Sequence, residues 1–456
     1  MSINTLETIA ASQPRISVIG NHNWDHYWEF DPFDATGLNF RLESGGTIDD
    51  YASVGADGSI EFKPDTLVAV VHDGTKYFYS PQTLTLGSGG KANTTVTTEP
   101  PQGKRIISPT IKMIIHGGGG QFVAEAIDAV STIPLTYTGP SHPGDIRFGQ
   151  YLNAKGIDHA LLPYLANQQA NIVISKVFGR GSFGEKTVVA DDRMILRGLG
   201  PGSTFSEESI GLAYGTVFIN SLKDERLGLR AVEEAKSSQS LGVIAMTPSC
   251  SRGLRKKSLA EGFIPIFSDE DLKDYTGNAI LRPDKRIDYA QVVDALRKIR
   301  TEQGSNRTRV YVTLGKEGSI CLDERDMVHR AECYFSTWQV TNTGAGDAFA
   351  AGVVLMEHMQ RYDPSFKEGI PLFLQLGSAM ARSKIAEGRV DAAIVNNTLA
   401  ENHINYREPL PLAEINEGNA QQLLNPDALR NVKGHTTLEK ILGRSARTYT
   451  GHRGAA

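Results

Sequence analysis

The chain has 456 residues, enough for one large α/β core with insertions or for two domains. Its hydrophobic fraction of 40% and charged fraction of 22% are ordinary for a globular protein and exclude wholesale disorder. The net charge of −5 gives no general basic field, so we expect no nucleic-acid partner.

The cysteines and the apolar runs indicate the compartment. Cys250, Cys321 and Cys333 are odd in number and widely spaced, so they form neither a disulfide frame nor a zinc pattern, and they suit a reducing environment. The sequence begins without a basic leader, and no stretch approaches the roughly 18 apolar residues of a membrane span. We therefore expect a cytoplasmic protein with no membrane partner.

The first strand is predicted at 16–19 and is closed by Gly20. From 29 to 111 the chain consists of short alternating runs broken by Gly, Asp, Pro and Thr, which predicts a β-rich insertion without helices. Within it, strands are expected at 59–62, 67–71 and 76–79.

A second pattern begins with a strand at 112–116, after which strands and helices alternate. Such alternation predicts a mainly parallel sheet covered on both faces, with ligands outside the carboxyl ends of its strands. Beyond 396 the pattern weakens, and a mobile tail is expected at the end. The predicted strands are 135–137, 216–219, 242–246, 264–267 and 310–314, and the predicted helices are 124–130, 146–155, 222–237, 252–261, 287–302 and 369–386.

A run of four glycines stands in IIHGGGGQF, residues 114–122. It is no dinucleotide fingerprint, because Gln121 and Phe122 follow the run where a third spaced glycine is needed, and the next strand has no acidic residue for a ribose. A flexible loop and a backbone that closely approaches a small polar ligand both remain open. The second is favoured, since glycines at a strand's carboxyl end permit close approach.

The stretch VFGRGSFGEKTVV, 177–189, imitates the phosphate-covering loop of protein kinases. The rest of that signature set is absent, and Glu185 separates Gly184 from Lys186, which excludes a P-loop. Strand-like residues flank the stretch on both sides, so it predicts a hairpin turn.

The stretch TNTGAGD, 341–347, combines a tight turn with a helix start. Gly344 and Gly346 let the backbone turn, and the first N–H groups of the helix, at the positive end of its dipole, form an anion site. Asp347 is then either an N-terminal cap or a general base beside a bound phosphate, kept ionised by the helix end. The motif alone leaves both open.

Five motifs in order resemble the ribokinase-like (PfkB) family of small-molecule kinases. The resemblance covers 16–28 and then about 112–395. The motifs are GNHNWD at 20–25, HGGGGQFVA at 116–124, GDIRFGQYLNAKGID at 144–158, VTLGKEG at 312–318 and TNTGAGDAFAAG at 341–352.

The resemblance implies an α/β fold, a ribokinase-like three-layer sandwich with a mainly parallel central sheet and a β-rich lid or insertion. The kinase domain would comprise 1–28 and 112–395, and 396–456 would form a C-terminal extension. The insertion, 29–111, is longer than the family's usual β lid; we expect it to cover the pocket or to pair with a second subunit in a homodimer.

The resemblance also implies the activity of an ATP-dependent kinase that transfers the γ-phosphoryl group to a hydroxyl of a sugar or sugar-like small molecule. Asp347 would be the general base, and Gly344, Ala345 and Gly346 would supply the anion hole. The residues implied for substrate are Asn23, Asp25, Gly118, Gly119 and Gly120, and those for the nucleotide are Thr313, Gly315, Gly318 and Thr343.

The chain departs from the family pattern at several places. Phe122 replaces a usual Asn, and the D-x-N-x-R region is reduced to TPSCSRG, 247–253. The family's magnesium-linked N-x-x-E aligns with SDED, 268–271, so Asp271 would hold Mg²⁺ through a water or be an ordinary acid at a helix start. Two alternatives stay open: a nucleoside kinase, whose base would need an apolar slot from Phe122 or Trp24, and a non-catalytic sugar- or nucleotide-binding relative.

Overall fold

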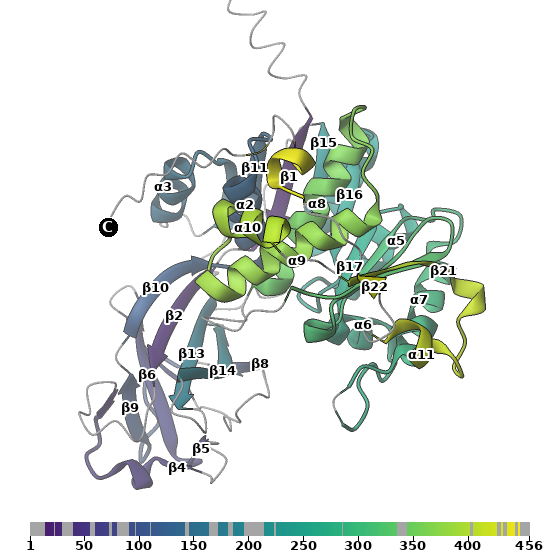
Figure 1. Cartoon of the computed structure of the whole chain (residues 1–456). Coiled ribbons are helices and arrows are strands. Elements are labelled where there is room, and N and C mark those ends of the chain that lie inside the picture. The colour runs from purple at the N-terminus through teal and green to yellow at the C-terminus, as the bar shows by residue number, and fades with distance from the viewer. Residues whose placement is uncertain are drawn as a thin grey trace, which may run out of the picture.

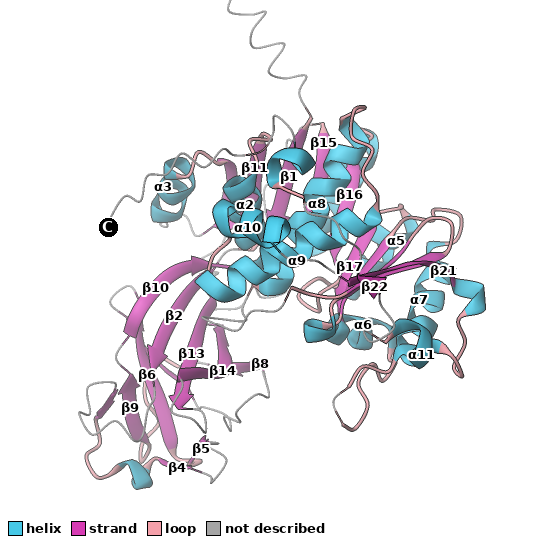
Figure 2. Ribbon diagram, in the orientation of Figure 1, coloured by secondary structure: helices cyan, strands magenta, loops and turns pink. Residues whose placement is uncertain are grey.

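The chain is a three-layer α/β sandwich with smaller β-sheets beside it (Figures 1 and 2). None of the helices in the described part of the chain combines the length and hydropathy of a membrane span. The computed structural model describes residues 14–21, 23–29, 40–54, 60–72, 75–79, 91–95, 97–109, 111–141, 146–163, 172–180, 186–195, 214–222, 225–284, 286–334, 344–401, 405–425, 430–431, 436–442 and 446.

The central sheet has 11 strands in the order β12-β11-β1-β15-β16-β17-β18-β19-β20-β21-β22. The seven strands from β12 to β18 are parallel, and the remaining four pair antiparallel, which confirms the predicted mainly parallel sheet. The bounds are β1 Arg15–Gly20, β11 Leu135–Ser141, β12 Asp158–Pro163, β15 Gly215–Asn220, β16 Leu241–Ala245, β17 Ile264–Ser268, β18 Val310–Thr313, β19 Ser319–Leu322, β20 Met327–Ala331, β21 Asn405–Pro411 and β22 Arg430–Asn431.

Helices cover both faces of this sheet and bury two separate apolar cores against it. β15 is buried at every position, as expected for a parallel strand between two helical layers. One layer consists of α2 Gly119–Val130, α3 Ile146–Ala154, α8 Ala345–Tyr362, α9 Ile370–Glu387, α10 Ala392–Glu401 and α12 Leu438–Leu442; the other consists of α4 Glu225–Ser237, α5 Arg252–Ala260, α6 Asp269–Thr276, α7 Tyr289–Gln303 and α11 Ala420–Leu424.

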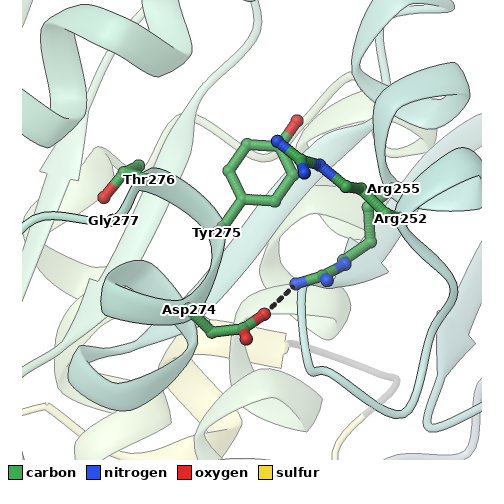
Figure 3. A pocket seen from close by; sticks show the side chains of 6 residues that line it. All are labelled: Arg252, Arg255, Asp274, Tyr275, Thr276 and Gly277. Atoms are coloured by element: carbon green, nitrogen blue, oxygen red, sulfur yellow. Dashed lines mark hydrogen bonds and ion pairs between the residues drawn. The ribbon is translucent and has the colours of Figure 1, made fainter.

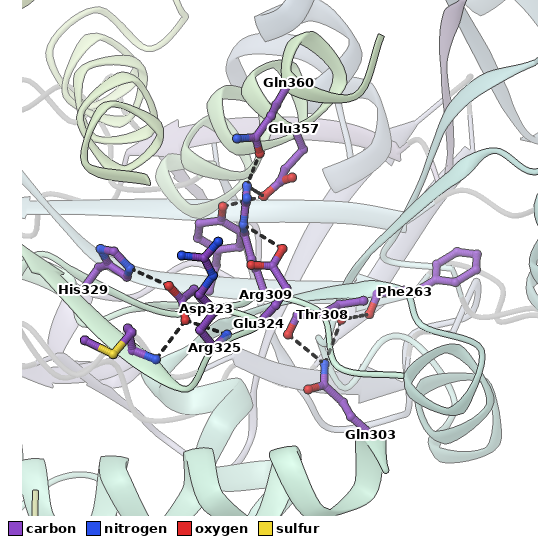
Figure 4. A network of polar contacts seen from close by, with 12 residues as sticks. Phe263, Gln303, Thr308, Arg309, Asp323, Glu324, Arg325, His329, Glu357 and Gln360 are labelled. Atoms are coloured by element: carbon purple, nitrogen blue, oxygen red, sulfur yellow. Dashed lines mark hydrogen bonds and ion pairs between the residues drawn. The ribbon is translucent and has the colours of Figure 1, made fainter. Parts of the chain in front are cut away.

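A buried polar network ties α8 to the central sheet (Figure 4). Arg309, just before β18, lies 3.0 Å from the carboxylate of Glu357 on α8 and 3.0 Å from that of Glu324. Tyr311 donates its hydroxyl to Glu357 at 2.5 Å. Burial raises the pKa of Glu357, and the guanidinium of Arg309 opposes that rise. These contacts hold α8 against β18 at a fixed position along its helix axis, and therefore help to place its N-terminus.

The β-rich part forms three further sheets that extend away from the α/β body (Figure 1). They have the orders β10-β2-β13-β14-β8, β3-β9-β6-β7 and β4-β5. The bounds are β2 Asn23–Glu29, β3 Phe40–Leu42, β4 Ala52–Val54, β5 Ile60–Phe62, β6 Thr66–His72, β7 Thr75–Tyr79, β8 Lys91–Thr95, β9 Arg105–Pro109, β10 Ile111–Gly117, β13 Ile172–Arg180 and β14 Lys186–Ile195, with a 3₁₀ helix at Ile48–Asp50.

Three sequence expectations are decided in this β-rich part. The two flanks of the stretch 177–189 pair antiparallel as β13 and β14, which confirms the predicted hairpin strands, while residues 181–185 between them lie outside the described residues. The strand predicted at 112–116 is present as β10, and strands and helices alternate from there through α2, β11, α3 and β12, as expected. β10 itself pairs antiparallel with β2 and lies outside the parallel sheet. The reason is that β2 follows β1 almost directly and carries the chain into the second sheet. The short 3₁₀ helix corrects the expectation of an insertion without helices.

The segment beyond 396 contributes to the body, although its sequence pattern is weak. β21 pairs antiparallel with β20 and extends the central sheet, and α11 packs into the core that α7 covers. β21 has the sequence NYREPLP, which lacks an apolar alternation, so its order comes from the neighbouring strand. The expected mobile tail at the end lies outside the described residues.

Candidate active site

Asp347 lies at the carboxyl edge of the parallel sheet, in the first turn of α8. Gly344 caps this helix in the left-handed region, with φ of 81°, and the cap has no side-chain hydrogen bond. Asp347 is therefore the third residue of α8 and not its N-cap residue. Its Oδ1 instead accepts a hydrogen bond of 2.7 Å from Nδ2 of Asn220, the last residue of β15. The carboxylate is thus held by a side chain from the sheet.

Asn220 is the residue of this site that the sequence reasoning missed. It is 1% exposed, and its Oδ1 accepts a hydrogen bond of 3.1 Å from the hydroxyl of Ser221. Because Ser221 fixes the oxygen, the amide presents its N–H₂ to Asp347. The available signal was a single polar residue that ends a buried strand, in the stretch TVFIN at 216–220.

The four-glycine stretch meets Asp347 through the start of α2. Gly118 has a φ of 113°, and α2 begins directly after it. A Cβ atom built on Gly119 would lie 2.7 Å from Nδ2 of Asn220 and 3.0 Å from Oδ1 of Asp347, and one on Gly120 would lie 2.8 Å from Cα of Gly20. Only glycine fits this approach. The structure thus brings the predicted glycine run and the predicted carboxylate together.

Two helix N-termini therefore converge on one point. α2 and α8 pack against each other, and each begins beside the Asn220–Asp347 pair. The unpaired N–H groups of both first turns, with the positive ends of both dipoles, favour an anion between them. A carboxylate close to such a place can accept a proton from a hydroxyl that attacks the anion.

Phe122 and Lys384 pack behind the turn at Gly344. The Nζ of Lys384 lies 4.2 Å from the ring centroid of Phe122 and donates a hydrogen bond of 2.5 Å to the carbonyl of Gly388. A Cβ atom built on Gly344 would lie 2.9 Å from Cε of Lys384 and 3.2 Å from Phe122. Phe122 is 9% exposed, so the ring supports the turn.

The residues expected at the nucleotide lie on the same edge of the sheet. Thr313 ends β18, and its hydroxyl donates to the carbonyl of Phe267 at 3.4 Å. Gly315 and Gly318 bound a 3₁₀ turn with φ values of 56° and 95°. Thr343 lies outside the described residues. β18 and β15 run in the same direction, so this turn and Asn220 share the carboxyl edge.

Asp271 makes the contacts of a capping box at the start of α6. Its Oδ2 accepts hydrogen bonds from the backbone N–H of Ser268 at 3.0 Å and from the Ser268 hydroxyl at 2.7 Å. These contacts fit the interpretation of an ordinary helix-start acid. Among the described residues no group of three His, Cys, Asp or Glu side chains is arranged to hold a metal ion.

Asn23 and Asp25 can be placed only by their backbone. Both lie on β2, where Asn23 pairs with Gly117 and Asp25 pairs with Ile115 of β10. Since β10 leads into the glycine run, the start of β2 lies beside that run. Their side chains lie outside the described part of the structure.

A cavity of about 320 Å³ lies between α5 and α6, in the helical layer opposite α8 (Figure 3). The guanidinium of Arg255 donates to Asp274 at 2.8 Å and lies 5.4 Å from the ring of Tyr275. The carboxylate of Asp274 offsets part of the positive charge of Arg252 and Arg255. The residues that line the cavity are Arg252, Arg255, Asp274, Tyr275, Thr276 and Gly277.

Comparison with known proteins agrees with this architecture. Residues 221–357 match the model of the pfkB family carbohydrate kinase, and no curated protein matches the sequence. Ribokinase from Giardia lamblia superposes with a TM-score of 0.51 at 14% identity, over 86% of this chain and 99% of that one.

Two other solved structures are similar to the same degree. Ribokinase from Cryptococcus neoformans var. grubii serotype A, in complex with ADP, has a TM-score of 0.50 at 14% identity, over 84% of this chain and 97% of that one. Adenosine kinase from Sinorhizobium meliloti has a TM-score of 0.50 at 14% identity, over 82% and 95%. At such identities the likeness concerns the fold. The family model over residues 221–357 and the ribokinase-like fold confirm the resemblance of this chain to the ribokinase-like (PfkB) family.

Proposed function

We propose that this protein is an ATP-dependent kinase that transfers the γ-phosphoryl group to a hydroxyl of a sugar or sugar-like small molecule. One observation supports the proposal above the others: a carboxylate held by Asn220 stands where the N-termini of α2 and α8 converge. Phosphoryl transfer needs mainly position and charge stabilisation, and this arrangement offers both. The matching family model points to the same chemistry.

In the proposed reaction Asp347 accepts the proton of the acceptor hydroxyl as that oxygen attacks the γ-phosphorus. The bond between the γ-phosphorus and the β–γ bridging oxygen breaks, and ADP leaves with that electron pair. The N–H groups of Gly344, Ala345 and Gly346 stabilise negative charge on the phosphoryl group in transit, an effect worth about 3–4 kcal/mol for a well-placed donor. Asn220 keeps the carboxylate at the right place for the proton. Mg²⁺ bound with the nucleotide would supply further positive charge at its phosphates.

The acceptor is proposed to lie against the glycine run, Gly118, Gly119 and Gly120, with its hydroxyls held by Asn23 and Asp25. The backbone register supports this, because Asn23 pairs with Gly117, the first glycine of the four-glycine run. On the nucleotide side, Thr313, Gly315, Gly318 and Thr343 would contact ATP, and Asp271 would reach the magnesium ion only through a water.

The domain organisation proposed is a kinase domain of 1–28 and 112–395, a β-rich insertion of 29–111 and an extension of 396–456. The insertion would cover the pocket or join two subunits. The enzyme would work in the cytoplasm, where ATP is available.

The test is an ATP-coupled assay with ribose, fructose, ribonucleosides, deoxyribonucleosides and sugar acids as acceptors. Turnover of a sugar or sugar acid supports the proposal, and Asp347→Asn should then lower kcat by at least about 100-fold. Turnover of nucleosides alone would establish the nucleoside kinase instead. Nucleotide binding without any turnover would point to a non-catalytic relative.

A further inference from the structure

The turn proposed for the nucleotide rests on a buried guanidinium. Arg330 lies on β20 and is only 1% exposed. Its side chain is among the largest fully buried ones of the described residues. A buried arginine is costly unless each of its five N–H groups finds an acceptor.

All five N–H groups of Arg330 have acceptors, and every acceptor is neutral. Nη1 and Nη2 donate to groups around Gly318, at the C-terminal end of the turn, and Nε donates to the C-terminal extension. Nη1 donates to the carbonyls of Ser319, at 3.3 Å, and Ala331; Nη2 donates to the hydroxyl of Tyr289, at 3.0 Å, and to the carbonyl of Glu317; Nε donates to the carbonyl of Leu424 at 3.2 Å.

Glu317, the last residue of the 3₁₀ turn, is held by its side chain as well. The hydroxyl of Tyr289 donates to Oε2 of Glu317 at 2.7 Å, while it accepts from Arg330. The backbone N–H of Ile287 donates to Oε1 of Glu317 at 3.4 Å. Arg330 and Tyr289 therefore fix both the main chain and the carboxylate of this residue.

The turn itself needs such support, because Gly315 and Gly318 both have positive φ and only two residues lie between them. A Cβ atom on Gly318 would collide with the carbonyl of Ala331, so the turn is pressed onto β20. A loop held in one conformation before binding loses less entropy when a ligand arrives.

We propose that Arg330 is a positioning residue that presets the Gly315–Gly318 turn for the nucleotide, and that α11 completes its hydrogen-bond shell. The C-terminal extension then contributes to nucleotide affinity through the carbonyl of Leu424. This inference rests on the proposed function, in which that turn binds ATP.

The test is calorimetric titration of ATP and of ADP into the full-length protein without acceptor. Arg330→Lys keeps the charge but loses the planar guanidinium with its five N–H donors. The Kd of this variant for ATP and for ADP should rise about tenfold, equivalent to about 1.4 kcal/mol. Tyr289→Phe removes only the hydroxyl between Arg330 and Glu317, and its Kd should rise about threefold or more. If Arg330→Lys does not fold, Tyr289→Phe decides the question.

Arg300→Lys is the matched control. Arg300 is also buried and donates to Asp326 at 2.7 Å, to the carbonyl of Thr308 at 2.8 Å and to that of Asp323, at the opposite end of the β18–β19 hairpin. The variant Arg300→Lys should be less stable than the wild type and should bind ATP and ADP with the wild-type Kd. Equal weakening in Arg300→Lys, or wild-type affinity in both Arg330→Lys and Tyr289→Phe, would overturn the inference.

Hydrogen exchange tests the part played by the extension. ATP should slow amide exchange at 315–318 and also at 420–424 in the wild type, and Arg330→Lys should lose the second effect. Unchanged exchange at 420–424 would refute that coupling. If the wild type binds no nucleotide at all, the proposed function itself fails, which separates the two failures.

Discussion

Replacing Gly119 by alanine changes one methyl group beside the candidate base. Gly119 is the first residue of α2 and lies outside the left-handed region, so alanine can adopt its backbone. The new Cβ would lie 2.7 Å from Asn220 Nδ2 and from Ser221 Oγ, and 3.0 Å from Asp347 Oδ1. To reach the 3.4 Å at which ordinary contact begins, the first two atoms must retreat by about 0.7 Å and the carboxylate oxygen by about 0.4 Å.

Displacements of this size, short of 1 Å, should lower kcat by about 10- to 100-fold, because misplacing a catalytic group by 1 Å can cost about 100-fold. The measurement is steady-state kinetics with the acceptor found in the panel. Gly369→Ala is the control, since its Cβ would have its nearest neighbour at 3.5 Å, an ordinary contact. If Gly119→Ala turns over as fast as Gly369→Ala, the geometry assigned to Asp347 is wrong.

Three more predictions concern the same framework. Asn220→Ala removes the hydrogen bond to Asp347 and should lower kcat by about 10- to 100-fold, as expected for about 1.5–3 kcal/mol; wild-type kcat would show that the bond has no part in turnover. Arg309→Met should lower the free energy of unfolding by about 3–5 kcal/mol by leaving Glu357 unpaired, and denaturant unfolding should show that adding Glu357→Leu restores most of it. Burial lowers the pKa of His358 to about 4, so the unfolded chain takes up the proton first as pH falls. Stability should therefore be lost between about pH 6.5 and pH 4, by up to about 3 kcal/mol, and His358→Gln should flatten that part of the pH profile.

The kinetic prediction for Asn220 has a matched control elsewhere in the chain. Asn278 is 4% exposed and donates to the carboxylate of Asp294 at 2.9 Å, in the layer of α6 and α7. Asn278→Ala should therefore lose stability without changing kcat. A similar loss of kcat in both variants would mean that the effect of Asn220→Ala is structural.

Elements with a strong apolar pattern were predictable from the sequence. The run at 216–219 became β15, and the helix expected at 287–302 became α7. α6 was missed because only Leu272 among its eight residues is buried, so no apolar stripe marks it. Its signals are local instead: the Ser268–Asp271 capping box at its start and Gly277, in the left-handed region, at its end.

In the candidate site, too, features with a local sequence signature could be predicted and long-range contacts could not. The glycine run and the turn at Gly344 could be predicted, because positive φ and a helix start leave a local signature. Gly346, expected to belong to the turn, instead lies within the first turn of α8. The contact between Asn220 and Asp347 could not, since it joins residues 127 positions apart and neither stretch encodes the other. The chemical roles assigned to these residues stay predictions.

The most direct measurement is a crystal structure with a non-hydrolysable ATP analogue and magnesium. The γ-phosphate should lie at the backbone N–H groups of Gly344, Ala345 and Gly346, at about 2.7–3.2 Å from their nitrogens, with the carboxylate of Asp347 facing the side from which an acceptor would attack. A triphosphate bound with its terminal group away from the start of α8 would contradict the proposed kinase mechanism.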